Sequence, residues 1–488
     1  MAPPSSLPHV AEAISTPVYR GTAYLRKRLG SFTWAPALSI AKPAILSLLS
    51  SIEVGTLLLI DKPGGQRYRF GQELSNDLDE LTPAEVMVLA DTSYGVRDAA
   101  AAPRVEMVVE KDSFWMRLFL FADMGFAEAY MLGEVECGDL TAFFQLFILN
   151  RDRLGNGTTW SSMITSAIAG LARSTNTMSN SLLNISAHYD ISNDMFAAFL
   201  SPDMTYSCPI WRETRPEIET TESLEQAQMT KLHRFISGAR IKPTDHVLEI
   251  GTGWGSFAIE AVRKTGCRVT SLTLSKEQKE LAEERIAAAG LSDRIHVLLK
   301  DYRALPVPET PYDKIISIEM LEAVGQDFLG TYFACINRLL KKKGGIAVFQ
   351  CITMPEGRHE AYSRTEDFIN HYIFPGGYLP SITQLLNHIT IESKGTLIVE
   401  RIENIGGHYA RALRLWRERF LATFEDTIRP ALRREHEDMG DEEVEVFRRK
   451  WEYYFAYSEA GFLTKTLGDV IITVGREGAL ELMQGIPL

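Results

Sequence analysis

A glycine-rich turn is the feature of this sequence most suited to holding a cofactor. An apolar run, Val247–Ile250, carries one acid, Glu249, and leads into three alternating glycines, Gly251, Gly253 and Gly255. Glycines in such a turn accept positive φ and let a ligand approach the backbone. The next apolar run ends in Thr273-Leu274-Ser275, where dinucleotide enzymes carry an acid for the ribose. The GxGxG spacing and Glu249 therefore favour S-adenosylmethionine over a dinucleotide.

A second residue that could do chemistry is Glu322. It follows a predicted strand at residues 314–318. Ligands of open α/β sheets bind at the carboxyl ends of the strands, so an acid at this position is more often functional than structural.

These residues need a parallel sheet to position them. From about residue 185 onward, strand patterns alternate with helical patterns, which is typical of a sheet covered by helices. The predicted strands span residues 246–250, 268–273, 295–299, 314–318, 345–351, 397–400 and 470–474. A long helical segment is expected at about residues 409–457, and its acids at 435–445 are interpreted as a solvated helix face and turn.

The chain divides into four predicted parts. Residues 1–50 form an amphipathic segment, 51–150 a small α+β domain that handles lipid, 151–184 a polar linker and 185–488 the catalytic domain. The small domain contains a very apolar helix at residues 112–124. The fold class is thus α/β, a Rossmann-like sheet with a smaller N-terminal α+β domain, and the glycine turn favours the form of this fold that S-adenosylmethionine-dependent methyltransferases have.

Composition limits the function classes. The 488 residues carry a net charge of −12, which argues against nucleic-acid partners. The five cysteines contain no CxxC pair, so neither a zinc ribbon nor a disulfide framework is expected, and no metal is assigned. No apolar stretch reaches the length of a membrane span, and no secretory signal is evident. The predicted location is cytoplasmic, with peripheral membrane association.

Several further segments resemble the cyclopropane-fatty-acyl-phospholipid synthase family, which includes the mycolic acid cyclopropane synthases. Besides the glycine turn, they are His188-Tyr189-Asp190, residues 204–208 (MTYSC), 272–275 (LTLS), 301–303 (DYR), 317–325 (SIEMLEAVG), 372–377 (YIFPGG) and 408–410 (HYA). The resemblance covers roughly residues 185–480 and extends more weakly to residues 125–131.

The resemblance implies transfer of a methyl group from S-adenosylmethionine to the cis double bond of an acyl chain, followed by proton loss that closes a cyclopropane. It implies that the cofactor's amino-acid end meets Tyr206 and Ser207, its ribose Thr273, Leu274 and Gln278, and its adenine Asp301 and Tyr302. Gln278 as a helix-surface residue and Tyr302 as a core aromatic remain alternatives.

The base that removes the proton is, by resemblance, a bound bicarbonate ion. The residues that match its surroundings are Cys208, Glu322, Gln350, Ile352 and Tyr409. Three positions depart from the family pattern: Gln350 replaces a histidine, Thr252 a cysteine of the glycine turn, and Ser458 a late cysteine. Gln350 can donate a hydrogen bond to an anion but cannot relay a proton. Methyl transfer to an alkene needs no covalent enzyme intermediate, so the roles at 252 and 458 are not expected to be nucleophilic.

Other functions stay open. A related C-methyltransferase would leave a methyl branch on a fatty acyl chain or sphingolipid without closing a ring. A lipid-binding protein without turnover and a small-molecule methyltransferase are further alternatives. The expected partners are unsaturated acyl chains at a phospholipid bilayer surface, and a homodimer remains open. The basic cluster Arg20–Arg28 and apolar residues between Trp34 and Leu49 are expected to dock the protein on the bilayer.

Overall fold

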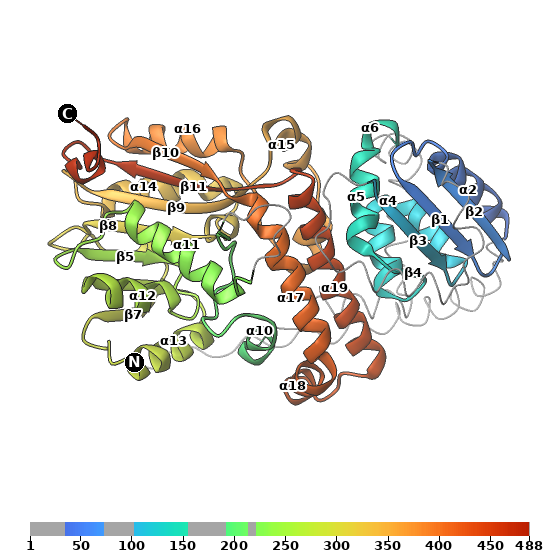
Figure 1. The fold of residues 1–488 in the computed structure, drawn as a ribbon, viewed down its shortest axis with the longest axis horizontal. Helices are drawn as coiled ribbons and strands as arrows, with labels where there is room; N and C mark the ends of the chain where they lie inside the picture. Colours follow the sequence, from blue (N-terminus) through green and yellow to red (C-terminus); the bar gives the residue numbers. More distant parts are fainter. Residues whose placement is uncertain (1–34, 73–101, 155–191, 213–220, 488) are drawn as a thin grey trace, which may run out of the picture.

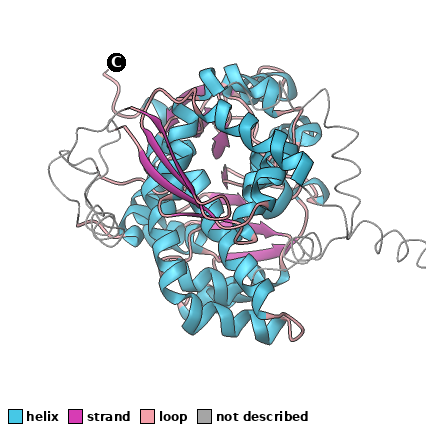
Figure 2. Ribbon diagram, turned by 90° about the vertical axis from the view of Figure 1, so that its right-hand side faces the viewer, coloured by secondary structure: helices cyan, strands magenta, loops and turns pink. Residues whose placement is uncertain are grey.

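The computed structural model describes residues 35–72, 102–154, 192–212 and 221–487. They form a large α/β part and a smaller N-terminal part, with two long helices, α17 (Tyr409–Thr423) and α19 (Asp441–Leu463), between them (Figure 1). Figure 2 shows the strands in the interior with helices around them. The His188–Asp190 motif, the cluster Arg20–Arg28 and most of the predicted linker lie outside the described residues.

The large part is built on a seven-stranded sheet of order β10-β11-β9-β8-β5-β6-β7. The strands are β5 (His246–Ile250), β6 (Arg268–Thr273), β7 (Ile295–Leu299), β8 (Lys314–Ile318), β9 (Ile346–Thr353), β10 (Ile398–Asn404) and β11 (Gly468–Gly475). All pairings are parallel except those of β11, which runs antiparallel to both β9 and β10. The sequence predicted β5 to β8 residue for residue, and β9 to β11 extend beyond their predicted limits.

Helices cover both faces of this sheet, because its strands are apolar on both sides. Along β9, Ile346 and Val348 pack in one hydrophobic cluster while Ala347 and Phe349 pack in the other. The first cluster includes residues of α11 (Leu224–Gly238), α12 (Ser256–Thr265) and α13 (Lys276–Ala288). The second includes residues of α14 (Leu329–Leu339) and α16 (Ile382–Ser393). The Rossmann-like α/β fold is confirmed.

The long helical segment predicted at residues 409–457 is not one helix. After α17 come a π-helical turn, η8 (Phe424–Ile428), and a short helix, α18 (Arg429–Glu435). The chain turns at Gly440 before α19 begins. Three acids occupy the first turn of α19, where the helix dipole favours negative charge. The acid-rich run therefore forms a turn and a helix start, as the sequence indicated.

The N-terminal part has a four-stranded sheet of order β2-β1-β3-β4, made of β1 (Thr56–Asp61), β2 (Gln66–Gly71), β3 (Arg104–Val109) and β4 (Val135–Cys137). Its helices are α2 (Ala35–Leu49), α4 (Ser113–Met131), α5 (Leu140–Leu149) and the single turn α6 (Arg151–Leu154). Helix α4 is the apolar helix that the sequence indicated, and it kinks at Ala122, whose φ is 49°. A side chain at Gly125 would meet the Arg117 carbonyl oxygen across this kink.

Helix α2 corrects the predicted boundary at residue 50. Its residues Ala41, Ile45 and Leu49 are buried, and Ile45 and Leu49 belong to the same core as Leu57 and Leu59 of β1. The helix is thus part of the small domain and not a separate surface segment. Within the described residues, none of the helices has the length and apolar character needed to cross a bilayer.

The smaller helices of the catalytic part surround the carboxyl edge of the sheet. They are α10 (Asn193–Phe199), η3 (Tyr302–Ala304), η4 (Leu321–Ala323), η5 (Gln326–Phe328), α15 (Glu356–Tyr362), η6 (Ile369–Ile373) and η7 (Gly406–His408), with η9 (Leu480–Met483) near the C-terminal end.

Candidate active site

The glycine turn lies between β5 and α12 with the conformation that the sequence predicted. All three glycines have positive φ: 99° at Gly251, 51° at Gly253 and 86° at Gly255. The backbone amides of Gly251 and Thr252 donate to the Leu272 carbonyl of β6, which fixes the turn against the next strand. A Cβ added at Gly253 would meet no atom within 4 Å. The turn therefore has an open side on which a ligand can approach the backbone.

Glu249 supports this turn from inside the sheet. Its carboxylate accepts a hydrogen bond from the Ser271 hydroxyl at 2.5 Å, and the hydroxyls of Ser271 and Thr252 lie 2.7 Å apart. Burial raises the pKa of Glu249 to about 8, while the hydrogen bond from Ser271 opposes that rise. Glu249 thus connects β5, β6 and the turn, and its contact with a cofactor stays a prediction.

The residues expected to meet the ribose lie at the end of β6. The Thr273 hydroxyl donates to Gln278 Oε1 at 3.0 Å and accepts from the Ser275 amide. The Leu274 side chain is 73% exposed. An apolar side chain so exposed beside the glycine turn is available to be covered by a ligand.

The residues expected to meet the adenine follow β7. Asp301 accepts hydrogen bonds from the backbone amide and the guanidinium of Arg303, and these bonds hold the pKa of its carboxyl below its usual range. The half-buried Tyr302 packs edge-on against Tyr332 of α14. Both residues lie at the same edge of the sheet as the glycine turn, and their roles remain predictions.

Tyr206 and Ser207 lie in a buried segment between α10 and α11. Tyr206 is surrounded by aromatic rings, and its hydroxyl lies 2.8 Å from that of Tyr454 on α19. The rings are those of Phe196, Phe199 and Trp416. Ser207 Oγ accepts a hydrogen bond of 2.6 Å from Nζ of Lys231, a fully buried lysine of α11 whose pKa is lowered by burial. This segment therefore combines aromatic faces with one buried cation.

The centre of the site is a carboxylate that the sequence analysis did not assign, Glu319. It follows β8 directly, and three donors converge on it. The Cys208 amide and Gln350 Nε2 donate to Oε1, each at 2.6 Å, and the Tyr409 hydroxyl donates to Oε2 at 2.8 Å. Glu319 has a φ of 46°, which is uncommon for a residue with a side chain.

A second unassigned acid, Asp469 of β11, lies beside it. Gln350 Nε2 also donates to Asp469 Oδ2, at 2.9 Å. Burial and the charge of Glu319 raise the pKa of Asp469 well above its ordinary value. Burial also raises the pKa of Glu319, whereas its hydrogen bonds and the charge of Lys231 lower it. Of the two acids, Glu319 has more groups that favour its charged form, because three donors converge on its carboxylate.

Glu322, the acid that the sequence selected, lies next to this pair on η4. Its Oε1 accepts a hydrogen bond of 2.5 Å from the Ile352 amide, and its buried Oε2 has no hydrogen-bond partner among the described residues. Burial, followed by the charge of Glu319, raises the pKa of Glu322 to about 8. The structure thus brings together all five residues predicted for the catalytic centre, Cys208, Glu322, Gln350, Ile352 and Tyr409.

The structure places both positions where the sequence departs from a cysteine in the interior. Thr252 hydrogen-bonds with Ser271, and Ser458 is buried in α19. The Cys208 thiol is fully buried, and burial raises its pKa well above the ordinary value, which disfavours a nucleophilic thiolate. None of the five cysteines forms a disulfide. The described residues contain no group of histidine, cysteine and acidic side chains suited to a metal.

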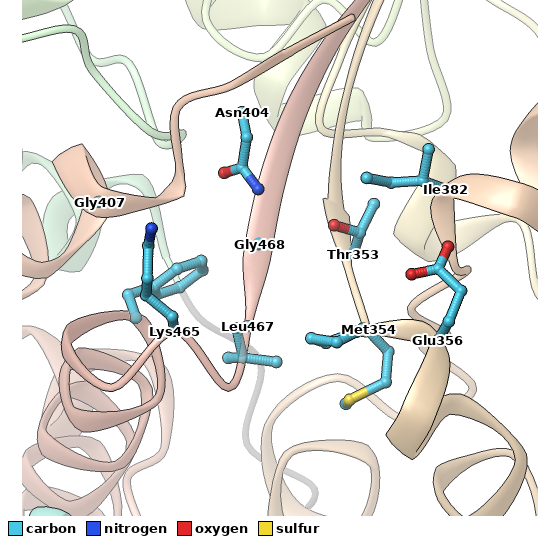
Figure 3. Close-up of a pocket in the computed structure, with 11 residues that line it drawn as sticks. Thr353, Met354, Glu356, Ile382, Asn404, Gly407, Lys465, Leu467 and Gly468 are labelled. Carbon is cyan, nitrogen blue, oxygen red and sulfur yellow. The ribbon is translucent and has the colours of Figure 1, made fainter.

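A cavity of about 180 Å³ opens at the same edge of the sheet, between the ends of β9 and β10 and the C-terminal end of α19 (Figure 3). Its walls include Thr353, Asn404 and Gly468, the residues that adjoin Ile352, Ile405 and Asp469. Phe462, another wall residue, packs against the ring of Tyr409 with the ring centroids 4.7 Å apart. The cavity therefore lies beside the acid cluster.

Glu319 and Asp469 were missed for different reasons. Glu319, like Glu322, is an acid that closely follows a buried strand. The family resemblance assigned a role to Glu322 and none to Glu319. Asp469 precedes an apolar strand near the end of the chain, and nothing in its local sequence connects it to β8.

Comparisons with known proteins agree with this geometry. The profile of the family described as Mycolic acid cyclopropane synthetase matches residues 176–471. A tuberculostearic acid methyltransferase of Mycobacterium tuberculosis is 38% identical over 421 residues, covering 85% of this chain and 94% of that protein. A cyclopropane-fatty-acyl-phospholipid synthase of Escherichia coli is 32% identical over 392 residues, covering 80% of this chain and 92% of that protein.

Among solved structures, the mycolic acid cyclopropane synthase CmaA1 complexed with SAH and CTAB superposes with a TM-score of 0.50 and 28% identity. The match covers 60% of this chain and 98% of that one. The match with CmaA1 thus leaves about 40% of this chain uncovered, whereas the two relatives above cover 85% and 80% of it.

Proposed function

The chain belongs to the mycolic acid cyclopropane synthetase family and is an S-adenosylmethionine-dependent methyltransferase, and we propose that it methylates the cis double bond of unsaturated acyl chains in phospholipids and then closes a cyclopropane ring. The observation that carries this proposal is the cluster of buried acids near the glycine turn and the aromatic segment at Tyr206. Cys208, Gln350 and Tyr409 donate hydrogen bonds to this cluster. The E. coli relative, by its name, supports a phospholipid substrate.

The residues present fit S-adenosylmethionine. Gly253 leaves open space for it, and Ser207 and Lys231 provide polar groups within the aromatic segment. When bound, this cofactor supplies an electrophilic methyl group on a sulfonium. The protein then has to orient the alkene against that methyl, because a weak nucleophile gains most of its rate from positioning.

The aromatic segment suits the charge that develops on the acyl chain. Rings of Tyr206 and Trp416 present electron-rich faces, which stabilise cations. Trp416 is fully buried and Tyr206 partly buried, which limits the access of water that would otherwise capture the cation. A buried carboxylate can then take the proton whose loss closes the ring.

Bicarbonate does not fit the centre as the side chains stand. The resemblance implied that Cys208, Gln350, Ile352 and Tyr409 surround this ion. In the structure the Cys208 amide, Gln350 Nε2 and the Tyr409 hydroxyl donate to Glu319. The Ile352 amide donates to Glu322. No donor of the predicted set is left for a separate anion, so no step is assigned to bicarbonate.

A second candidate product is a methyl-branched or methylene-branched chain without a ring. The M. tuberculosis relative, which is named a tuberculostearic acid methyltransferase, shares more identity with this chain than the E. coli relative does. The methyl-transfer step would be the same. Loss of a proton from the cation would then leave a methylene branch, and a saturated methyl branch would require a further hydride donor.

Mass spectrometry of lipids distinguishes these functions. Purified full-length protein would be incubated with S-adenosylmethionine and vesicles of an unsaturated phospholipid. We expect a mass gain of one CH₂, loss of the olefinic protons and cyclopropane protons in the NMR spectrum. A methyl or methylene branch with the same or a similar mass gain would support the second candidate. Binding of the cofactor without any lipid product would contradict both.

We also infer that the protein works at a membrane surface. Helix α2 exposes Ile40 and Leu48, with 65% and 43% of their surface accessible, and the basic cluster Arg20–Arg28 precedes it in the sequence. Cationic and apolar residues together favour an anionic bilayer. In vesicle flotation, Ile40→Asp/Leu48→Asp should bind anionic vesicles less than wild type, whereas Val307→Asp, an exposed residue of the catalytic part, should not. Equal binding of all three proteins would contradict the inference.

A further inference from the structure

We propose that Glu319 replaces a bound bicarbonate ion and is itself the catalytic base that removes the proton after methyl transfer. This inference rests on the proposed function, because it assigns the base of that reaction to a residue of the chain. It follows from a disagreement between the expected ligand set and the contacts that the structure shows.

The first argument is that the hydrogen-bond donors expected to hold bicarbonate donate to Glu319 instead. A carboxylate and a bicarbonate ion both present two oxygens that share one negative charge, so a cage of donors built for one can hold the other. Three members of the expected cage, the Cys208 amide, the Gln350 amide group and the Tyr409 hydroxyl, all donate to Glu319 at 2.6–2.8 Å. The carboxylate of Glu319 therefore occupies the place expected for the ion.

The second argument is the backbone. Glu319 leaves β8 with a φ of 46°, a conformation that favours glycine. Residues held in such conformations persist when surrounding contacts determine them, and they cluster at active sites. Here the three hydrogen bonds hold the side chain in the centre of the site despite that strain.

The third argument is the charge. The charge of buried Lys231 and the three hydrogen bonds lower the pKa of Glu319 against the effect of burial, whereas burial and the charge of Glu319 raise the pKa of Asp469 well above its ordinary value. Glu319 is therefore available as a carboxylate in a buried site, which is the state required of a base. Glu322, with one amide donor and an unpartnered Oε2, is less well stabilised as an anion.

The step balances without an added reagent. After methyl transfer, a C–H bond of the new methyl group breaks, and its electron pair forms the second C–C bond to the cationic carbon. The proton passes to Glu319 Oε1 or Oε2, which becomes a carboxylic acid. The sulfonium leaves as the neutral thioether, and Glu319 releases its proton before the next turnover.

Binding of bicarbonate tests the inference without relying on turnover. We would titrate ¹³C-labelled bicarbonate into the full-length protein and follow its line width by NMR. Wild type should show no saturable binding. Glu319→Gly, which removes the side chain at a backbone position that suits glycine, should bind the ion, and Glu319→Gly/Tyr409→Phe should bind it more weakly. Saturable binding to wild type would overturn the inference, and so would the absence of binding to a folded Glu319→Gly protein.

Activity gives a second, independent readout. In carbonate-free buffer, wild type should keep its full rate of lipid methylation, and Glu319→Gly should lose at least ~100-fold, a typical contribution of a general base. Added bicarbonate should restore part of the Glu319→Gly rate but none of the Glu319→Gln rate, because glutamine fills the space without accepting the proton. Glu360→Gln, which alters an exposed acid of α15, is the matched control and should behave as wild type.

The outcomes separate the two proposals. A wild-type rate that falls when bicarbonate is removed, or a Glu319→Gly variant that keeps its rate in carbonate-free buffer, would overturn the role of Glu319 while leaving the proposed function intact. A wild-type protein that methylates no lipid would overturn the proposed function, and the NMR titration would still decide which anion occupies the cage.

Discussion

Two acids three positions apart, Glu319 and Glu322, have different surroundings although both lie at the carboxyl end of β8. Glu319 receives three hydrogen bonds, whereas Glu322 receives one from the Ile352 amide. Hydrogen bonds to a carboxylate stabilise its charged form, and burial opposes it. The larger number of hydrogen-bond donors stabilises the carboxylate of Glu319 and makes it the better base. Glu322, whose pKa is raised to about 8, is the weaker candidate.

The contribution of one donor can be measured with Tyr409→Phe. Loss of this hydroxyl removes a hydrogen bond of 2.8 Å to Glu319 Oε2. We expect kcat for lipid methylation to fall about 10- to 100-fold, the usual effect of losing a hydrogen bond to a charged group, with an unchanged KM for S-adenosylmethionine. Tyr312→Phe, at the opposite end of β8, is the control. A Tyr409→Phe variant with the kcat of wild type would show that this bond does not support the base.

The raised pKa of Glu249 should make the free energy of unfolding depend on pH. Burial raises its pKa to about 8 from an ordinary value of 4.5. A carboxyl with a raised pKa contributes stability that is fully present below the unfolded-state pKa and is lost as the pH rises through the folded-state value. Wild type should therefore lose stability relative to Glu249→Gln between pH 5 and 8, by at most about 1.4 kcal/mol per pH unit.

Thermal unfolding of both proteins from pH 5 to 9 measures this effect. The stability difference should change across that range and level off above about pH 8. Glu360→Gln, an exposed acid, should follow wild type throughout. A difference between Glu249→Gln and wild type that does not change with pH would contradict the assignment of a buried, neutral Glu249.

At the scale of elements, the glycine turn and the strand ends it joins form the cofactor side of the site. Gly255 begins α12 with a φ of 86°, and a Cβ there would lie 3.4 Å from Ala282 of α13. Gly253 has a positive φ as well but faces open space. The first glycine is thus needed for packing between elements, and the second for access to the backbone.

Gly253→Ala tests that distinction. The positive φ should cost about 1–2 kcal/mol of stability. If a ligand occupies the open side, affinity for S-adenosylmethionine should fall by a larger factor than this cost alone would produce. Gly290→Ala is the matched control, since Gly290 also has a positive φ (69°) and open space but follows α13 away from the turn. Calorimetric titration and thermal unfolding measure both effects, and equal affinity of the two variants would contradict the role of Gly253.

At the scale of the whole molecule, α19 joins the two domains. Its Arg449 is buried and donates to the carbonyls of Tyr130 and Val135 and to the carboxylate of Glu136 in the N-terminal domain. The guanidinium also lies 4.2 Å from the ring centroid of Tyr130. The same helix carries Tyr454, which contacts Tyr206. Through α19, the small domain is therefore connected to the aromatic segment of the site.

Arg449→Ala should loosen this connection. Two buried carbonyls would lose their donor, so the free energy of unfolding should fall by about 2–4 kcal/mol. Arg448→Ala, which removes only ion pairs within α19 to Glu445 and Glu452, should cost less than about 1 kcal/mol. Denaturant unfolding followed by circular dichroism measures both variants. Equal losses would show that the interdomain bonds of Arg449 contribute little.

Local patterns made the catalytic fold predictable. Strands β5, β6 and β8 are short runs buried on both faces, and the edge strand β7 is buried at alternate residues. Helical segments separate them, and each was predicted residue for residue. Helix α2 was assigned to a separate segment because its apolar residues give no sign of which surface they cover. Only packing against β1 showed that it belongs to the small domain.

The sequence alone determined the family, the positions of the strands β5 to β8 and the glycine turn, since each depends on residue types at short spacing. It also predicted five residues for the catalytic centre, which the structure places close together. The tertiary structure decided which acid those residues serve. Glu319, Asp469 and Gln350 come from three strands, and hydrogen bonds between them depend on the register of β8, β9 and β11. Pairing between β9 and β11, which lie over 100 residues apart in the chain, leaves no trace in local sequence. The contacts from which we infer that a protein carboxylate replaces a bound ion were therefore visible only in the folded molecule.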